Sequence, residues 1–232
     1  MGETIEFPVN GTSARGYLAL PPSGSGPGVM VVQEWWGLSP QLKGVTDRFA
    51  AEGFVALAPD LYHGELATHD EMDKASELMN KTVPSGQAAT DMMGAIDHLL
   101  GLDATTGFDV GVVGFCMGGL LAMKIAALAG SKVGAAAPFY GAPIGDDTID
   151  WSNLSAVVRG HFAELDDFFP PDACQALFDE LKVMGHDVEI TVHPGTHHAF
   201  VNEENAIGPY YDEAAATKAL GATFDLFRST LG

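Results

Sequence analysis

Apolar residues gather along the chain in short continuous runs, separated by longer segments in which apolar and polar residues are mixed. Continuous apolar runs rich in valine and alanine are typical of strands buried on both faces of a parallel sheet. Such runs occupy residues 28–33, 54–59, 110–115, 133–139, 156–162 and 188–193. Two earlier runs, at 4–9 and 14–20, could pair with each other as an antiparallel edge. The pattern therefore predicts about eight strands.

The segments between the runs repeat their apolar residues at helical spacing. Leu42, Val45 and Phe49, for example, fall on one face of a helix. Helices are predicted over residues 41–51, 70–80, 86–100, 117–129, 172–184 and 210–231. The alternation of strands with helices indicates an α/β fold with a mostly parallel central sheet and helices on both faces. Ligands bind such sheets at the carboxyl ends of the strands, so we sought candidate chemistry there.

Length and composition support one folded domain over residues 1–232. Hydrophobic residues make up 47% of the chain, which is enough for a large core. No apolar run reaches the roughly 18 residues needed for a membrane span. The first residues, MGETIEFPVNG, lack the basic and apolar regions of a secretory signal. We therefore expect a cytoplasmic protein.

The chain is strongly acidic, with 31 acidic against 11 basic residues and a formal net charge of −20. This charge argues against nucleic acid and anionic membranes as partners. A solvated surface that aids solubility and adaptation to a salty cytoplasm both fit it. The two cysteines are too few for a disulfide framework. One of them, Cys174, repeats with Leu177, Phe178 and Leu181 at helical spacing and is predicted to be a core residue.

Each of the six later runs is followed by a residue capable of chemistry. Five of these strand ends carry an ionisable group and the sixth carries a tyrosine. The residues are Glu34, Asp60, Cys116 and Tyr140, then Glu164, Asp166 and Asp167 together, and finally His197 and His198. Because parallel strands end at the same edge of a sheet, we expect these side chains to lie close together.

The sequence Gly114-Phe115-Cys116-Met117-Gly118 joins a predicted strand directly to a predicted helix. Enzymes of the α/β-hydrolase fold carry their nucleophile in a G-x-S-x-G turn, followed along the chain by an acid and then a histidine. Here Cys116 occupies the serine position, and acids and histidines follow in the same order. Glycines let the strand and helix pass closely, and a helix N-terminus favours a thiolate. Cys116 is therefore interpreted as a nucleophile; the alternative is a packed cysteine in a tight turn.

Two pairs of adjacent, identical residues leave it undecided which acid and which histidine belong to this arrangement. Asp166 and Asp167 are adjacent, and so are His197 and His198. The acid must reach one ring nitrogen of the histidine while the other nitrogen faces Cys116. The residues alone do not choose within either doublet.

A metal site built from His193, His197 and His198 is a further possibility. Pro194 and Gly195 separate these histidines and predict a loop, so the spacing lacks the helical i, i+4 register of common zinc motifs. We therefore expect neither a metal nor another cofactor.

Six motifs together resemble the dienelactone hydrolase family of α/β-hydrolases over nearly the whole chain. They are QEWWG (33–37), APDLYHG (58–64), GFCMGG (114–119), PFYG (138–141), ELDDFFP (164–170) and PGTHHAF (194–200). The G-[FY]-C-x-G-G turn is the most specific of them, because cysteine is unusual there among α/β-hydrolases. The family's D-x-x-x-P pattern selects Asp166 as the acid, and its G-x-x-H-x-F pattern selects His198. Asp167 and His197 then become structural neighbours or residues at the edge of the pocket.

The resemblance also implies roles outside this triad. The glutamate at the position of Glu34 pairs with the resting thiol and helps to take its proton when substrate arrives. A carboxylate beside a thiol disfavours ionised sulfur through like-charge repulsion, which makes this role physically plausible. The alternative is a buried carboxylate paired with a backbone amide or another side chain. The backbone amides of Trp35 and Met117 would hold the oxyanion.

The resemblance supports the family's catalytic residues better than it supports the family's substrate. Family members that act on dienelactone hold its carboxylate with arginines. One of these follows the catalytic histidine, where this chain has Val201 and Asn202, and residues 61–100 contain no arginine. Lys74 is a conceivable substitute, although an ordinary surface lysine is the simpler interpretation.

The resemblance therefore implies a monomeric enzyme of carboxymethylenebutenolidase type, which cleaves a small-molecule lactone or activated ester through an acyl-cysteine. An apolar pocket would be lined by Trp36, Tyr140, Phe168 and Phe200, each of which could equally be plain core, and His63 is expected to be a loop residue. One alternative is a general carboxylesterase or thioesterase with the same triad. A non-catalytic small-molecule binding protein on this fold is the other.

Overall fold

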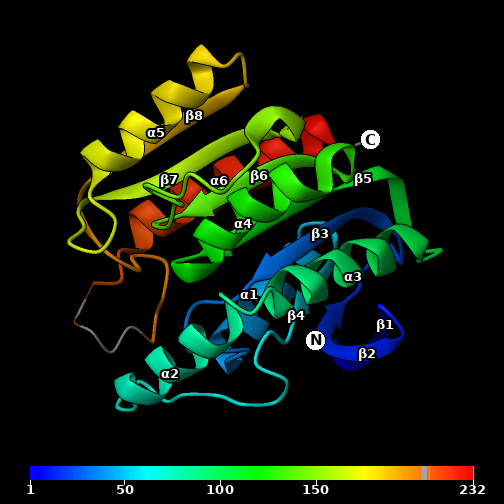
Figure 1. Cartoon of the computed structure of the whole chain (residues 1–232). Coiled ribbons are helices and arrows are strands. Elements are labelled where there is room, and N and C mark those ends of the chain that lie inside the picture. The colour runs from blue at the N-terminus through cyan, green and yellow to red at the C-terminus, as the bar shows by residue number, and fades with distance from the viewer. Residues whose placement is uncertain (205–207, 209, 232) are drawn as a thin grey trace.

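One eight-stranded sheet forms the centre of the part of the chain that the structure describes (Figure 1). The structure is a computed structural model and describes residues 1–204, 208 and 210–231. The strands are β1 (Glu3–Val9), β2 (Thr12–Ala19), β3 (Gly26–Val32), β4 (Val55–Pro59), β5 (Thr105–Phe115), β6 (Val133–Phe139), β7 (Val157–Leu165) and β8 (Val188–His197). The predicted α/β fold class and number of strands are confirmed.

The strands lie in the order β1-β2-β4-β3-β5-β6-β7-β8. β1 pairs with β2 and β2 with β4 in antiparallel fashion, and all later neighbours are parallel. The first two strands thus form the predicted antiparallel edge. Strands β3, β5, β6 and β7 are neighbours that run the same way, so the loops that follow them meet at one edge of the sheet.

Six α-helices and two short 3₁₀ turns connect the strands within the described residues. The helices are α1 (Pro40–Ala51), α2 (Met72–Thr82), α3 (Gln87–Gly101), α4 (Met117–Ala129), α5 (Pro171–Val183) and α6 (Glu213–Thr230), and the 3₁₀ turns are η1 (Gly130–Lys132) and η2 (Trp151–Asn153). Local chemistry sets some of their starts. The Ser39 hydroxyl accepts a hydrogen bond from the amide of Leu42 at 3.1 Å, which caps α1.

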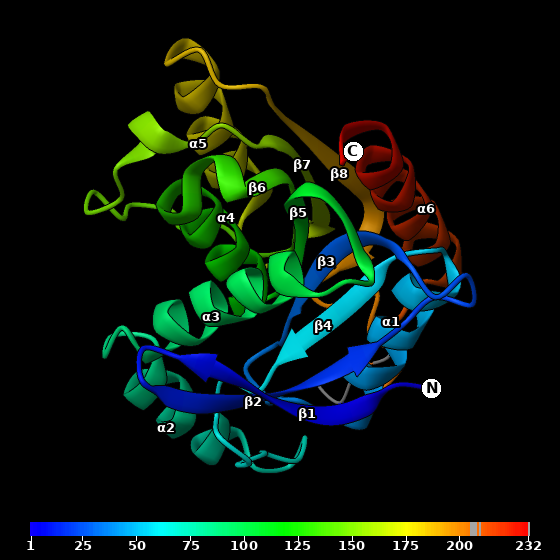
Figure 2. The same cartoon turned by 90° about the vertical axis from the view of Figure 1, so that its right-hand side faces the viewer.

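The helices cover both faces of the sheet, as Figure 2 shows, with α1 and α6 on one side and α2 to α5 on the other. Alternate residues of a buried strand therefore enter different cores. In β3, Met30 and Val32 pack toward α3 and α4, whereas Val29 and Val31 pack toward α1 and α6. This double burial explains why the strands appear in the sequence as continuous apolar runs.

Four element boundaries differ by three residues or more from the sequence-based expectations. β5 begins at Thr105 rather than 110, and β7 ends at Leu165 rather than 162. β8 continues to His197, through the Pro194-Gly195 pair that predicted a loop. Proline is tolerated there because β8 is an outer strand of the sheet, where one side needs no ladder of donors. α6 begins at Glu213 rather than 210, because the Asp212 carboxylate accepts a hydrogen bond from Ala215 at 2.9 Å and caps the helix.

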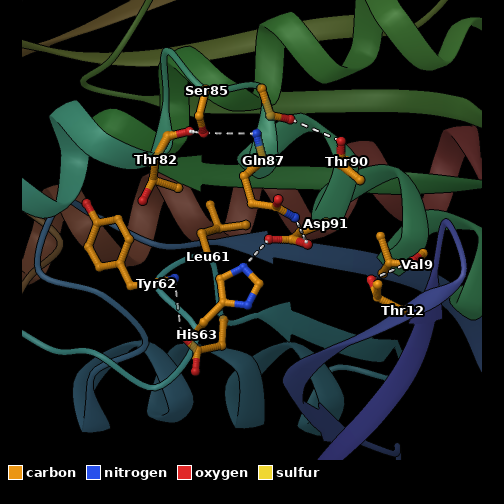
Figure 3. A network of polar contacts seen from close by, with 12 residues as sticks. Val9, Thr12, Leu61, Tyr62, His63, Thr82, Ser85, Gln87, Thr90 and Asp91 are labelled. Atoms are coloured by element: carbon orange, nitrogen blue, oxygen red, sulfur yellow. Dashed lines mark hydrogen bonds and ion pairs between the residues drawn. The ribbon is translucent and has the colours of Figure 1, made fainter.

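A polar network ties the turn between α2 and α3 to the loop after β4 (Figure 3). His63 Nε2 lies 2.8 Å from Asp91 Oδ2, and Gln87 Nε2 donates to Asp91 Oδ1 at 2.9 Å. The Ser85 hydroxyl donates to the Thr82 carbonyl at 2.8 Å and accepts from the Gln87 amide at 3.2 Å. His63 is thus a loop residue with a structural partner, and the network anchors the turn at the end of α2.

Candidate active site

Cys116 occupies a sharp turn between β5 and α4, where its backbone adopts a conformation that side chains rarely take. Its φ is 55° and its ψ is −118°, a combination that costs free energy for any residue with a Cβ atom. The turn is held on both sides: the Cys116 amide donates to the Phe139 carbonyl at 3.0 Å, and its carbonyl accepts from Gly119 at 2.9 Å. The thiol is thereby placed at the carboxyl end of β5, at the first turn of α4.

Close approach of backbones explains the glycines that follow. A Cβ atom on Gly118 would lie 2.5 Å from the Gln33 carbonyl oxygen, and one on Gly119 would lie 2.7 Å from the Phe139 carbonyl oxygen. Both distances are shorter than a real Cβ atom allows. The first turn of α4 therefore packs directly on the chain that leaves β3 and β6, which brings the elements after these strands next to Cys116.

Asp166 and His198 are in direct contact beside this turn. His198 Nδ1 lies 2.9 Å from Asp166 Oδ2, and both side chains are buried. The other carboxylate oxygen, Oδ1, accepts hydrogen bonds from the amides of Phe168 at 2.9 Å and Phe169 at 3.0 Å. The carboxylate is therefore fixed by its own loop and holds the imidazole in one orientation.

The other member of each doublet points elsewhere. Asp167 is exposed to solvent. His197, the last residue of β8, is half-buried and stacks on Tyr210 with ring centroids 4.4 Å apart. The structure brings together Asp166 and His198 and leaves Asp167 and His197 outside this contact.

The environment of His198 favours its protonated form. Burial alone lowers the pKa of the imidazole, but the charge of Cys116, the hydrogen bonds from Asp166 and Cys116 and the charge of Asp166 together raise it to about 10. Because Nδ1 faces Asp166, Nε2 is the nitrogen that remains for the sulfur. Asp166, His198 and Cys116 thus form a continuous chain of interacting groups.

Glu34 is a buried carboxylate close enough to His198 for the two charges to interact. The Tyr140 hydroxyl donates to Oε1 at 3.2 Å, and the Asn202 amide donates to Oε2 at 2.8 Å. Burial raises the pKa of the Glu34 carboxyl, while the charge of His198 and these two donors act in the opposite direction. Burial likewise raises the pKa of Tyr140 well above its ordinary value, so the phenol remains a hydrogen-bond donor. The sequence analysis noted Asn202 only as a position at which an expected arginine is missing. It therefore did not count Asn202 among the site residues.

A cavity of about 400 Å³ is lined by both Cys116 and His198. The rest of its wall comes from the chain after β3, from α2 and the turn that follows it, from α4 and from the loop after β7. These lining residues are Trp35, Met79, Asn80, Val83, Pro84, Met117, Leu120, Phe168 and Phe169. A larger cavity of about 530 Å³ between α3, α4 and the segment 148–153 contains neither Cys116 nor His198. The smaller cavity is therefore the candidate substrate pocket.

Two backbone amides at this cavity have no partner in the part of the chain that the structure describes. Trp35 follows the end of β3, and Met117 is the first residue of α4. Neither amide donates a hydrogen bond to another described protein group. Amides at a helix N-terminus and at a strand end are well suited to bind negative charge on an oxygen atom.

The four aromatic residues expected in the pocket occupy different places. Phe168 is half-exposed and lines the cavity. Trp36, Tyr140 and Phe200 lie outside its lining and are buried in the surrounding packing. Trp36 packs edge-on against His69, and Phe200 packs against Tyr140. Tyr140 contacts the site in two ways: its hydroxyl group donates to Glu34, and its ring packs edge-on against the His198 ring with centroids 5.2 Å apart.

A second histidine pair lies behind the site and was missed by the sequence analysis. His161 Nδ1 lies 3.2 Å from His193 Nε2, and both rings are buried. Burial, together with the charge of His193, lowers the pKa of His161 to about 3, so the ring is neutral. His193 therefore does not join His197 and His198 in one cluster, and no group of three or more potential ligands that could hold a metal ion occurs among the described residues.

The remaining candidates have ordinary structural environments. Cys174 is buried in α5, and burial raises the pKa of its thiol to about 12, which leaves it un-ionised. Lys74 forms an ion pair with Glu71 at 3.7 Å on the surface of α2 and does not line the cavity. Neither residue contributes to the candidate site.

Comparison with known proteins shows to which family the chain belongs. The family model described as the dienelactone hydrolase family matches residues 14–231. The chain belongs to this family. A protein from Aquifex pyrophilus named "Protein usf" is 38% identical over the full length of both chains. A relative from Aquifex aeolicus, provisionally named a carboxymethylenebutenolidase, is 36% identical, again over the full length of both.

Solved structures of dienelactone hydrolases share the fold. A protein from Klebsiella pneumoniae, provisionally described as a dienelactone hydrolase, superposes with a TM-score of 0.85 at 24% identity and covers 98% of each chain. A dienelactone hydrolase-like promiscuous phosphotriesterase from metagenomic libraries gives a TM-score of 0.87 at 21% identity, over 100% of this chain and 99% of that one. The expected family and fold are thus confirmed for this dienelactone hydrolase family member.

Among the described helices, none combines the length and the apolar character that crossing a bilayer requires. The expected cytoplasmic location and monomeric state of this family member stay predictions.

Proposed function

We propose that the protein hydrolyses an ester or lactone through an acyl-cysteine intermediate, with Cys116 as nucleophile, His198 as proton carrier and Asp166 as the group that orients His198. The observation that carries the proposal is the contact chain from Asp166 through His198 to Cys116 at the wall of an apolar cavity. Family membership agrees with hydrolysis, and the relatives whose names refer to carboxymethylenebutenolidase suggest a lactone or activated ester.

In the first half of the reaction, the sulfur of Cys116 attacks the carbonyl carbon of the substrate. The carbonyl electron pair moves to oxygen, and the amides of Trp35 and Met117 donate hydrogen bonds to the resulting oxyanion. When this intermediate collapses, the bond to the leaving alcohol breaks, and His198 Nε2 gives the alkoxide its proton. The products are an acyl-cysteine and an alcohol, or an open-chain acyl-enzyme in the case of a lactone.

In the second half, His198 must act as a base. Acylation neutralises the sulfur, which removes one of the two groups that raise the pKa of His198. The neutral imidazole then takes a proton from water as the water attacks the acyl carbon. Collapse of the second oxyanion releases the carboxylic acid, returns the electron pair to sulfur and restores the starting pair. Asp166 keeps Nδ1 engaged throughout, so Nε2 faces the reacting atoms.

We assign Glu34 the task of accepting the proton of the Cys116 thiol when substrate arrives, so that His198 keeps its own proton for the leaving group. Burial raises the pKa of this carboxyl, which makes its ionised form a stronger base than a surface glutamate. Its two oxygens accept hydrogen bonds from Tyr140 and Asn202. Proton transfer from sulfur therefore requires one of these hydrogen bonds to give way, which couples the position of Glu34 to the state of the site.

The alternative function in the same class is a general carboxylesterase or thioesterase with the same three residues. The apolar wall of the cavity favours this alternative over a lactonase for charged lactones. A panel of cis- and trans-dienelactone, 4-nitrophenyl acetate and acyl thioesters discriminates between them. A clear preference for the simple esters over every lactone would replace the lactonase assignment by the esterase one.

Single substitutions in the histidine doublet test the mechanism with a matched control. His198→Ala should reduce kcat/KM by about 10³-fold or more, because the proton carrier is lost. His197→Ala removes the neighbouring imidazole, which stacks on Tyr210 away from the cavity, and should leave kcat/KM within about threefold of wild type. Equal losses in the two variants, or no loss in His198→Ala, would refute the assigned role of His198.

A further inference from the structure

The wall of the substrate cavity is almost entirely apolar. Apart from Cys116 and His198, the lining side chains are two methionines, a valine, a proline, a leucine, a tryptophan, two phenylalanines and one asparagine, Asn80. Among the described residues of the lining there is no lysine, arginine, aspartate or glutamate. The Asn80 amide already donates to the Ser76 hydroxyl at 3.3 Å on the surface of α2. A substrate therefore meets hydrocarbon over most of the cavity wall.

The cations nearest to this wall along the chain are engaged elsewhere. Lys74 and Lys81 both lie on α2, the helix that contributes Met79 and Asn80 to the cavity. Lys74 pairs with Glu71 at 3.7 Å, and Lys81 pairs with Glu65 at 3.5 Å, and both pairs are exposed to solvent. Neither lysine lines the cavity. An anionic group bound there would find no cation from this helix.

The loop after His198 supplies no positive charge either. Asn202 is the polar side chain that this loop sends toward the site, and its amide nitrogen is bound to Glu34 Oε2 at 2.8 Å. The partner it serves is itself an acid. Apart from His198, whose charge is balanced by Asp166, the inner end of the site therefore presents no cation, and the whole chain carries a formal charge of −20.

A carboxylate on the body of a substrate loses hydration in such a cavity without gaining a partner of its own, because His198 is already paired with Asp166 and the amides of Trp35 and Met117 serve the oxygen of the reacting carbonyl. Leaving a charged group buried and unpaired costs more free energy than leaving a neutral polar group unpaired. An uncharged aryl or alkyl group of the same shape instead gains free energy from the apolar wall. The two kinds of substrate should therefore differ in transition-state binding, since each factor of ten corresponds to about 1.4 kcal/mol.

We infer that this site is selective for uncharged esters with an apolar aryl or alkyl body and discriminates against substrates that carry a carboxylate on that body. The inference rests on the proposed hydrolase function and deepens it by naming the substrate class. The apolar lining sets the preference, and Asn80, which is exposed at the rim, is the one neutral polar side chain available to a substituent. A cavity of about 400 Å³ is at the small end of ligand pockets, which suits a compact ester.

A pair of substrates that differ only in charge tests this inference. 4-Nitrophenyl 4-methylbenzoate and 4-nitrophenyl 4-carboxybenzoate share a leaving group and nearly share a shape. Each kcat/KM is divided by the rate constant for hydroxide hydrolysis of the same ester, which removes intrinsic reactivity. We expect the 4-methylbenzoate ester to be favoured by about 100-fold over the 4-carboxybenzoate ester. The preference should persist in 1 M salt, where the Debye length falls to about 3 Å and the surface field is screened.

Two variants on α2 with the same change in charge separate the cavity from the surface. Asn80→Arg places a guanidinium group at the rim of the cavity, whereas Glu77→Gln changes the net charge equally at an exposed position outside the lining. We expect Asn80→Arg to reduce the preference at least tenfold, because the carboxylate gains a partner. Glu77→Gln should leave the preference within about twofold.

The outcomes distinguish this inference from the proposed function. Hydrolysis of both esters at similar normalised rates, or a preference that disappears in high salt, would overturn the inference and leave the hydrolase in place. An equal response of Asn80→Arg and Glu77→Gln would also overturn it, because the surface charge would then account for selectivity. Failure to hydrolyse either ester, together with failure on the wider ester and lactone panel, would overturn the hydrolase proposal and this inference with it.

Discussion

Replacement of Gly118 by alanine should separate the role of the nucleophile turn from that of an ordinary helix. Gly118 lies in the first turn of α4, where an added Cβ atom would lie 2.5 Å from the Gln33 carbonyl oxygen and still closer to that of Val32. Both atoms belong to the backbone at the end of β3 and cannot rotate away. The helix must therefore move from the sheet by roughly half an ångström to one ångström, since Cβ contacts below 3.0 Å are essentially never found.

Overpacking of this kind costs about 1–3 kcal/mol, which exceeds the 0.5–1 kcal/mol that alanine gains over glycine within a helix. We therefore expect the free energy of unfolding of Gly118→Ala to fall by about 1–2 kcal/mol. The same movement separates Cys116 and Met117 from the residues that follow β3, including Trp35 and Glu34. Because a misplacement of about 1 Å can cost about 100-fold in rate, kcat/KM should fall by about that factor.

Urea unfolding followed by tryptophan fluorescence measures the stability change, and ester hydrolysis measures the rate. Gly44→Ala is the matched control, because Gly44 lies within α1 and a Cβ atom there would meet nothing within 4 Å. It should gain about 0.5–1 kcal/mol without a change in activity. A Gly118→Ala variant as stable and as active as the Gly44→Ala variant would refute the close-packing account of the turn.

Three further predictions follow from buried polar groups. The pKa of His198 is raised from 6.5 to about 10 in the folded state, so its contribution to stability should be complete below pH 6.5 and lost as the pH rises to about 10; the urea midpoint at pH 6 and pH 10 measures this loss. Asn202→Leu removes a donor to Glu34, so the pKa of this carboxyl should rise further, as read from its ¹³C chemical shift during titration. His63→Ala leaves the buried Asp91 carboxylate without one partner and should destabilise the fold by about 1–2 kcal/mol in urea unfolding.

Each of these predictions has a result that contradicts it. His198→Gln should lose the part of the pH dependence that the imidazole causes, so an unchanged pH profile in this variant would exclude His198 as its source. A Glu34 carboxyl that titrates identically in Asn202→Leu would mean that the Asn202 hydrogen bond is not formed in solution. For the His63 network, stability equal to wild type would show that Gln87 alone satisfies Asp91.

The main elements could be predicted from the sequence because each strand is buried on both faces. Such strands appear as continuous apolar runs, and the helices between them have a single apolar face. The prediction failed at β8, where proline and glycine suggested a loop. Pro194 is accommodated there because β8 is an outer strand, a property of the sheet order that a local pattern does not contain.

The sequence located the edge of the sheet where the candidate site lies, but not the contacts within it. Asp166 and Asp167 are chemically identical, and only the loop after β7 turns the first inward and the second into solvent. Glu34 accepts hydrogen bonds from Tyr140 and Asn202, which lie far from it in the sequence. The separations are 106 and 168 positions, respectively. Neither pairing leaves a local pattern, although Tyr140 was already marked by its place directly after a strand.

The aromatic residues expected in the pocket likewise could not be placed from local sequence patterns. Trp36 and Phe200 follow chemically important residues in the sequence, yet both are packed into the core. The apolar wall comes instead from α2 and the turn that follows it, including Met79 and Val83. Amphipathic spacing shows that α2 has an apolar face, but it does not show that part of this face borders a cavity.

The proposed mechanism requires Cys116 to carry the acyl group during turnover. Rapid acid quenching during turnover of 4-nitrophenyl acetate, followed by peptide mass spectrometry, locates the acyl group directly. We predict acetylation of the peptide that contains Cys116 and none of the peptide that contains Cys174, whose thiol is buried and un-ionised. Cys116→Ala should show no acetylation and no turnover above background. Acetylation at another residue, or hydrolysis by Cys116→Ala at a rate near wild type, would contradict the proposed mechanism.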